Sequence, residues 1–228
     1  RNAKHYQFRA WIKAITLNTG KYEKGQKVAI KILEAAEDLL IDEGYKSLSI
    51  RRIASRCGIT PGNLQYYFPS KDVLLEALLK KIIQGYLEEF ERLRQDAGMD
   101  PVMQLRAILT HVITDLNTKR TTHFFPEVWA LSNHESSITQ SLDQMYGAYR
   151  DVIKEIVLKI NPSISKERAA DLALFITASL EGHTIFIGHQ KPWRNKTAGI
   201  IEIALESFTS LIEKDDPMID KFQKAVGD

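Results

Sequence analysis

Apolar residues recur every three to four positions along most of this chain, which is the spacing of helices with one buried face. A clear case is Ile50, Ile53, Ala54 and Cys57, which share one side of a helix. No run shows the sustained apolar–polar alternation of a half-buried strand. The pattern therefore predicts an all-α protein of about nine helices. They cover 25–43, 49–56, 60–67, 70–97, 101–118, a shorter stretch from near Pro126 to Leu131, 136–159, 166–187 and 195–213.

Turn-forming residues separate the two short helices predicted at 49–56 and 60–67. Gly58 tolerates the left-handed backbone that often ends a helix. Thr60 is a good N-cap, and Pro61 suits the first position of a new helix. Two short helices joined this tightly form a helix-turn-helix, whose second helix enters the DNA major groove. The sequence therefore predicts DNA binding through the helix at 60–67.

This region resembles the DNA-binding part of the tetracycline-repressor (TetR) family of transcription regulators. The similarity covers about the first third of the chain and includes the helix at 25–43. The residues that carry it are Ile53, Ala54, Gly58, Ile59, Gly62, Leu64, Tyr67, Phe68, Lys71, Leu74 and Leu75. Members usually have Tyr where this chain has Gln65, so the operator sequence cannot be borrowed from relatives.

The resemblance implies a helix-turn-helix DNA-binding domain over 25–71 and an effector-binding and dimerisation domain over 72–228. Residues 1–20 are basic and contain no acidic residue, which predicts a basic N-terminal arm over 1–24; a transit peptide is the alternative. Asn63 and Gln65 can pair with adenine, and Arg51 with guanine, each through two hydrogen bonds. The DNA-binding residues we predict are Ser49, Arg51, Arg52, Thr60, Pro61, Gly62, Asn63, Gln65, Tyr66, Tyr67 and Lys71. Each of them, taken singly, could instead be an ordinary solvent-facing side chain.

Charge is distributed unevenly along the chain. Residues 1–72 hold 13 Lys/Arg against 7 Asp/Glu, a difference of +6, whereas residues 73–228 hold 18 against 22, a difference of −4. Scattered Lys and Arg are by themselves ordinary surface. Combined with the helix-turn-helix, a basic N-terminal part is what binding to phosphates requires.

The last two predicted helices favour a homodimer. The final helix has a continuous apolar stripe, and the helix before it is apolar on nearly every side, so it must be covered all round. Two such helices and their copies would form a four-helix bundle, which is also the dimer interface of the TetR family. The predicted interface residues are Leu180, Ile201, Leu205, Phe208, Leu211 and Ile212. The alternative is that both helices lie inside a larger monomeric bundle.

The resemblance also implies a small-molecule pocket among the helices at 100–118, 121–133, 136–159 and 166–187. Its candidate lining residues are His111, Phe125, Trp129, Tyr146, Tyr149, Phe175 and His183. Each could equally serve in core packing. Glu181, together with His111 and His183, could orient a polar group of a ligand within an otherwise apolar cavity.

These features predict a ligand-responsive, sequence-specific regulator, most simply a repressor that binds a palindromic operator as a dimer and is released by a small apolar effector. The alternative is a helix-turn-helix architectural or cell-division regulator without an effector. No nucleophile elbow, phosphate-binding glycine loop, metalloprotease helix or dinucleotide fingerprint indicates an enzyme. No cofactor is predicted, and no metal, because the six histidines lack an i, i+4 pair and the single cysteine has no partner.

The remaining signals predict a cytoplasmic protein without a membrane segment. A lone cysteine excludes an internal disulfide and fits a reducing compartment. Cys57 lies on a buried stripe, which favours a core residue over a redox sensor. No secretory signal is seen. The most apolar stretch, Leu172 to Ile187, is interrupted by Glu181 and its two neighbours, which favours a buried helix over a membrane span.

Overall fold

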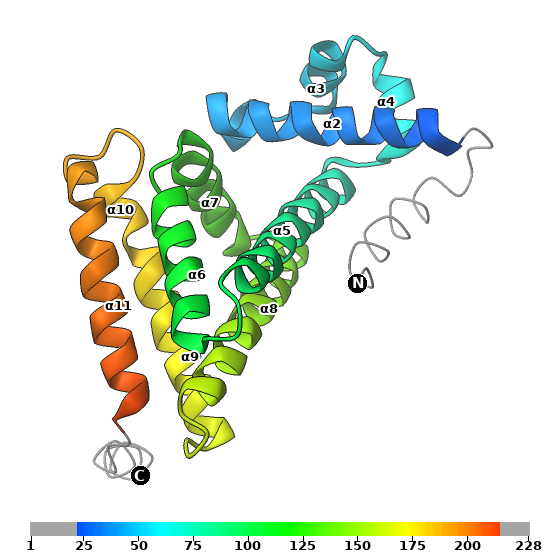
Figure 1. Cartoon of the computed structure of the whole chain (residues 1–228). Helices are drawn as coiled ribbons and strands as arrows, with labels where there is room; N and C mark the ends of the chain where they lie inside the picture. The colour runs from blue at the N-terminus through cyan, green and yellow to red at the C-terminus, as the bar shows by residue number, and fades with distance from the viewer. Residues whose placement is uncertain (1–21, 215–228) are drawn as a thin grey trace, which may run out of the picture.

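The computed structural model describes residues 22–214, and within this range every regular element is a helix (Figure 1). The elements are α2 (Tyr22–Glu43), the 3-10 turn η1 (Tyr45–Ser47), α3 (Ile50–Cys57), α4 (Pro61–Tyr67), α5 (Lys71–Asp96), α6 (Pro101–Asp115), α7 (Lys119–Ser132), α8 (Ser136–Ile160), α9 (Lys166–Gly182), α10 (Thr184–Ile187), the 3-10 turn η2 (Arg194–Lys196) and α11 (Thr197–Glu213). The all-α prediction is confirmed. Most of the predicted basic arm, residues 1–21, lies outside the described residues.

Short-range side-chain contacts define the two motif helices. The Ser49 hydroxyl accepts a hydrogen bond from the Arg52 amide at 3.4 Å and caps α3. Gly58 ends α3 in the left-handed conformation, with φ of 69°. The Thr60 hydroxyl accepts from the Asn63 amide at 3.2 Å, which caps α4. The predicted helix-turn-helix is therefore present, with Gly58 and Thr60 in their predicted roles. The cap by Ser49 was not predicted.

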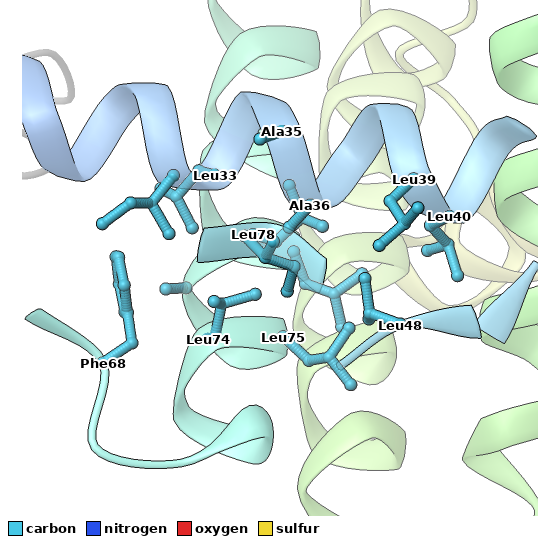
Figure 2. Packing of buried hydrophobic residues seen from close by; sticks show 14 of the residues in the cluster. Leu33, Ala35, Ala36, Leu39, Leu40, Leu48, Phe68, Leu74, Leu75 and Leu78 are labelled. Carbon is cyan, nitrogen blue, oxygen red and sulfur yellow. The ribbon is translucent and has the colours of Figure 1, made fainter. Parts of the chain in front are cut away.

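A hydrophobic core between α2 and α5 supports the motif. Figure 2 shows Leu33, Ala36 and Leu40 of α2 facing Leu74 and Leu78 of α5. All five are almost fully buried, and burial of each leucine side chain contributes about 1.5–3 kcal/mol. Because α3 and α4 pack on the same cluster, their orientation is set by α2 and by the first turns of α5.

Helix α5 runs from this core into a second one. Its start contributes Leu74, Leu75 and Leu78 to the first cluster, and Phe90 near its end lies in a second cluster with residues of α6, α8, α9 and α11. Figure 1 shows α5 leading away from the motif helices toward the bundle formed by α6–α11. The predicted domain boundary at residue 72 falls in the first turn of a helix that both cores share.

The connection from α6 to α7 differs from the prediction. Helix α6 ends at Asp115 rather than near 118, and α7 begins at Lys119, so that Pro126 lies inside the helix and not at its start. The Thr118 hydroxyl accepts a hydrogen bond from the Thr121 amide at 3.2 Å and supplies the N-cap. Packing of α7 against α2 and α8 outweighs the one helical hydrogen bond that proline cannot donate.

The helix predicted over 166–187 is divided in the structure. Helix α9 ends at Gly182, and the four-residue α10 follows after His183. Glycine has a low helix propensity, which is consistent with the break. Within the described residues, Lys166–Ile187 is the only stretch with the length and composition of a membrane-spanning helix, and 39% of its most apolar window is buried. Much of this apolar surface is thus left uncovered by the rest of the protomer.

Candidate DNA-binding surface and effector cavity

Helix α4 buries one side and presents the other to solvent. Leu64 and the following Phe68 have almost no exposed surface, because they pack into the core of the motif. Pro61, Gly62 and Asn63 are exposed. Gln65 and Tyr66 are exposed as well, on the same short helix. The structure therefore exposes these five predicted DNA-binding residues on α4.

The two neighbouring arginines of α3 are in different situations. Arg52 is held by Glu43, with Nη2 and Oε2 separated by 2.6 Å, and its other terminal nitrogen donates to the Ser47 carbonyl at 3.4 Å. The Arg51 side chain is exposed and has no hydrogen bond or ion pair with another side chain of the described range. Arg51 is therefore available to a base or phosphate, whereas Arg52 would first have to leave its partners.

Lys71, at the start of α5, lies against an aromatic ring. Its ammonium nitrogen is 3.5 Å from the centre of the Tyr45 ring, a cation–π contact. Partial burial of this ammonium lowers the pKa of Lys71 from its usual value. Nearby, the rings of Tyr66 and Tyr67 pack edge to face, with their centres 5.4 Å apart. Sequence analysis did not single out Tyr45, because its position beside Lys71 depends on the turn that precedes α3.

Helix α7 braces the DNA-binding domain from the other side. The carboxylate of Glu37 on α2, 8% exposed, pairs with Arg120 of α7 and with Lys81 of α5. The Glu127 carboxylate of α7 accepts a hydrogen bond from the Tyr45 amide at 2.9 Å. These contacts attach the turn before the motif to the same helix that lines the interior of the bundle.

A narrow cavity lies among α5, α6, α7, α8 and α9. The space between its lining atoms, open solvent included, is about 490 Å³, of which about 40 Å³ can hold the centres of water-sized molecules. Its walls are mainly aliphatic and aromatic, with carboxyl and hydroxyl groups set among them. The lining residues are Ile83, Tyr86, Leu87, Phe90, Val112, Asp115, Leu116, Thr121, Phe125, Met145, Tyr146, Tyr149 and Glu181. This composition is typical of a site for a small, largely apolar molecule.

Hydrogen bonds occupy most of the polar groups on the α5–α7 side of the cavity. Asp115 accepts from the Tyr86 hydroxyl at 2.5 Å and from the Thr121 hydroxyl at 2.7 Å. Burial and the Asp115 charge raise the pKa of Tyr86 well above its usual value. On the α8 side, the Tyr146 hydroxyl accepts from the Trp129 indole nitrogen at 2.9 Å.

Burial changes the acidity of Glu181. It raises the pKa of this carboxyl from 4.5 to about 7, while a hydrogen bond with Tyr146 partly opposes the rise. Desolvation disfavours the charged form of any carboxyl group. Glu181 therefore lies close to the midpoint of its titration at neutral pH.

Replacement of Glu181 by Gln should stabilise the protein above pH 7. With a folded pKa of about 7 against 4.5, the native wild type binds the extra proton between these values, so its unfolding free energy falls as pH rises through that window. The loss amounts to at most about 3 kcal/mol, and a neutral Gln escapes it. Urea unfolding at pH 5 and pH 8, at one fixed protein concentration, measures the difference.

The control for that experiment is Glu167→Gln, an exposed glutamate in the first turn of the same helix. It should leave the pH dependence of stability as in the wild type. A Glu181→Gln variant whose stability shifts by the same amount at both pH values would contradict the assigned burial effect.

The structure brings three of the seven predicted pocket residues to the cavity: Phe125, Tyr146 and Tyr149. Trp129 is not a lining residue, but its indole nitrogen donates a hydrogen bond to the hydroxyl of the lining residue Tyr146. The remaining three are not among the lining residues, and these are His111, Phe175 and His183. The sequence analysis missed Tyr86, Asp115 and Thr121, whose signal was a polar group on the buried face of a helix.

His111 and Phe175 take other positions. The His111 ring lies outside the cavity and packs edge-on against the rings of Tyr86 and Phe90. The distances between ring centres are 6.5 Å and 6.2 Å. Phe175 is 54% exposed, and the centre of its ring lies 6.1 Å from the centre of the Phe208 ring on α11. His183 caps the end of α9, and partial burial lowers its pKa.

The predicted interface residues mostly face the interior of the protomer. Leu180, Phe208 and Ile212 are at most 5% exposed and lie in the second core. Ile201, Leu205 and Leu211 are partly buried against the same cluster. Burial within the chain corrects the interface prediction for Leu180, Phe208 and Ile212. Ile201, Leu205 and Leu211 keep part of their surface exposed, so their place in an interface stays a prediction.

A different set of apolar side chains is exposed on these helices. Leu174 and Phe175 on α9, Ile185 and Phe186 on α10, and Ile203 on α11 are each 54–66% exposed. Of these five residues, the sequence analysis singled out only Phe175, and it predicted that Phe175 lines the cavity. Their apolar character was readable from the sequence, but their exposure depends on which face of each helix packs inward.

Within the described residues, no group of three or more His, Cys, Asp or Glu side chains lies close enough together to hold a metal ion. Cys57 is buried beside α2, and burial raises the pKa of its thiol. A thiol that is hard to ionise is a poor nucleophile, which suits its role in packing.

Comparisons with known proteins agree with this architecture. The family model described as bacterial regulatory proteins, tetR family, matches residues 32–78. An HTH-type transcriptional regulator in the dhlA 5′ region of Xanthobacter autotrophicus is 31% identical over 169 residues, which are 72% of this chain and 82% of that protein.

Two solved structures share the fold. A TetR transcription regulator from Haloarcula marismortui matches with a TM-score of 0.57 at 18% identity, over 82% of this chain and 94% of its own. The transcriptional regulator FadR from Bacillus subtilis, in complex with stearoyl-CoA, matches with a TM-score of 0.63 at 15% identity, over 79% and 97%. The relatives of the present chain are transcriptional regulators, and this protein is not an enzyme. The chain belongs to the TetR family of DNA-binding transcription regulators.

Proposed function

We propose that this regulator binds a near-palindromic operator as a homodimer in the cytoplasm and represses transcription until a small molecule occupies the cavity. The observation that carries the proposal is the exposed face of α4, where Asn63 and Gln65 stand free on a helix whose other side is anchored by Leu64. Both amide side chains suit adenine in the major groove. Ser49 and Thr60 stand at the N-caps of the two motif helices, beside the phosphates in this docking mode.

The proposed dimer face consists of the exposed apolar residues Leu174, Phe175, Ile185, Phe186 and Ile203. Exposed apolar surface of this kind commonly marks a protein–protein interface. A twofold axis through this face would repeat the recognition helix, so that two copies read two half-sites of a palindrome. As the apolar character of α9 predicts, a second copy would cover the exposed side of this helix. The residues that form the interface would differ from those predicted from the sequence.

The cavity favours a sensor over an architectural protein without an effector. The bundle is not completely filled: a narrow apolar cavity remains, and the Tyr149 hydroxyl at its wall has no hydrogen-bond partner within the described residues. The fold neighbour FadR holds stearoyl-CoA, so the fold accommodates an effector with a long apolar part. For this chain we infer a smaller molecule within the cavity described above.

Two helices connect the cavity to the motif. Helix α5 contributes Tyr86 and Phe90 to the lining and Leu74 to the core beneath α4. Helix α7 contributes Phe125 to the lining and Glu127 to the turn before α3. An effector that releases DNA must bind the conformation unable to bind DNA more tightly, and operator DNA must then weaken effector binding by the same factor.

The sequence-reading role of α4 is tested with Gln65→Ala. Operator sites are first selected from random DNA, and binding is then measured against every single-base variant of the selected site. The substitution should relax discrimination at one position of each half-site by about 1–3 kcal/mol, because a pair of hydrogen bonds to one base is lost.

Gln95→Ala is the matched control, since Gln95 is an exposed glutamine near the end of α5, in the part of that helix that packs on the second core. It should retain the full specificity of the wild type. Unchanged specificity in Gln65→Ala would show that this residue does not read a base, and failure to enrich any site would contradict the proposed function itself.

A further inference from the structure

The charged groups of the cavity are all acidic. Two carboxyl groups, Asp115 and Glu181, are among its lining residues, whereas none of the lining residues is Lys, Arg or His. A ligand with a carboxylate or phosphate in this space would therefore face negative charge with no cation among the lining residues. The nearest cation on this side, Arg120, lies 6.0 Å from the centre of the Tyr86 ring and is paired with Glu37. Burial of an unpaired anion in apolar surroundings is strongly unfavourable.

The two carboxyl groups differ in how far their hydrogen-bonding capacity is used. Asp115 already accepts from Tyr86 and Thr121. Glu181 is approached by the Tyr146 hydroxyl, and a carboxylate can accept about four hydrogen bonds. Arg150 lines a groove on the outer side of Glu181 but forms no ion pair with it within the described residues. Glu181 is thus the acidic group left with capacity for a ligand.

Hydroxyl groups without partners lie on both sides of Glu181. Tyr149 is 7% exposed and lines the same cavity, and its buried hydroxyl has no hydrogen-bond partner within the described range. Thr177, one turn before Glu181 on α9, is 3% exposed, lines the outer groove, and has an equally unsatisfied hydroxyl. Buried polar groups are rarely left unpaired, and such a group at a cavity wall points to a partner that a ligand supplies.

We propose that the effector is a protonated amine with an apolar body, and that its ammonium group binds between the Glu181 carboxylate and the Tyr149 hydroxyl. This assignment rests on the proposed effector role of the cavity. An ammonium group has three N–H donors, which match a carboxylate and a hydroxyl that lacks a partner. The rings of Tyr86 and Phe90 can face a cation favourably, and the aliphatic walls receive the apolar body.

Proton linkage gives this binding mode a signature. The carboxyl of Glu181 has a pKa of about 7, because burial disfavours its charged form. The titratable groups that face it are Tyr146 and Tyr149 from α8, Asp115 from the end of α6, and Tyr86 from α5. The three tyrosines stay protonated at neutral pH, since their pKa values are raised. A bound ammonium group would favour the carboxylate and release the proton of Glu181.

Calorimetric titration of the full chain with octylamine, octanol and octanoate at pH 7 tests the assignment without DNA. We expect octylammonium to bind about tenfold or more tightly than octanoate, because only the cation complements the carboxylate. Titrations in buffers of different ionisation enthalpy should show about half a proton released per site. Tighter binding of octanoate, or proton uptake with octylamine, would overturn the proposal.

Three variants locate the site. Glu181→Gln should weaken octylammonium binding about tenfold or more and abolish proton release, while octanol binding stays the same. Tyr149→Phe removes only the unpartnered hydroxyl and should weaken octylammonium binding severalfold without loss of proton release. Glu167→Gln, exposed on the same helix, should behave as the wild type. Octylammonium affinity unchanged in Glu181→Gln would refute the assignment.

The outcome is separable from that of the proposed function. Failure to select an operator would refute DNA-dependent regulation, whereas the amine titrations report on the cavity alone. If octylammonium bound as expected and an operator were selected, addition of the amine to the operator complex should release DNA in the wild type but not in Glu181→Gln.

Discussion

Phe175→Glu is expected to give a monomeric protein whose operator affinity is lower by about a hundredfold or more. Phe175 is 54% exposed on α9, within the proposed dimer face, so the protomer itself can accept a charge at this position. In a dimer the same carboxylate would be buried without a partner, which is strongly unfavourable. A single recognition helix per molecule would then read one half-site, without the gain from tethering two.

Sedimentation at micromolar concentration and operator titration measure the two effects. Met99→Glu is the matched control: Met99 is 97% exposed in the connection between α5 and α6, so its replacement introduces the same charge away from the proposed face. It should remain dimeric with full operator affinity. A monomeric wild type under these conditions would contradict the dimer, and a dimeric Phe175→Glu would contradict this choice of face.

A second substitution separates interface from core. Phe208 on α11 is 5% exposed and contacts Phe175. Phe208→Glu should therefore lower the free energy of unfolding of the protomer itself, whereas Phe175→Glu should leave the protomer fold intact. Circular dichroism during thermal unfolding distinguishes the two cases. Similar loss of helical structure in both variants would show that Phe175 also belongs to the core.

The second large effect is on the salt dependence of operator binding. If about six phosphates are contacted in the complex, affinity should fall on the order of a thousandfold between 50 and 200 mM salt. Contacts to phosphates displace counterions, and this release becomes less favourable as salt rises. Titration of the selected operator at several salt concentrations gives the slope.

Lys71→Ala should reduce that slope by about one and weaken binding similarly across DNA sequences, because a phosphate contact carries no sequence information. Lys159→Ala, which removes an exposed lysine at the end of α8, should leave the slope unchanged. Lys71 also lies over the Tyr45 ring, so thermal unfolding should accompany the measurement. An affinity that does not vary with salt would contradict phosphate anchoring.

The DNA-binding motif could be predicted from residue types and their spacing, because its signals are local. Ser49 and Thr60 cap helices through amides only three residues away, and Gly58 supplies a backbone conformation that few other residues adopt. Such contacts need no distant partner, so residue type and spacing predict them directly. The exposed residues of α4 follow from the same pattern, since Leu64 fixes which side of the helix is buried.

Tertiary structure decided which apolar faces pack within the protomer. Periodicity showed that α9 and α11 are strongly apolar, but it could not say that Phe208 packs inward while Phe175 and Ile203 remain exposed. The start of α7 was likewise missed, because its packing against α2 and α8 tolerates Pro126 within the helix. Both outcomes depend on neighbours far away in the sequence.

The cavity depended on tertiary structure most of all. Tyr86, Tyr149 and Glu181 come from three different helices and meet only when the bundle is assembled. The sequence shows that these polar residues lie on largely apolar helices. The raised pKa of Glu181 and the unsatisfied hydroxyl of Tyr149, however, arise from burial in the assembled bundle. Local sequence determines which side chains are present and how each helix begins and ends, whereas desolvation depends on everything that surrounds a group in space.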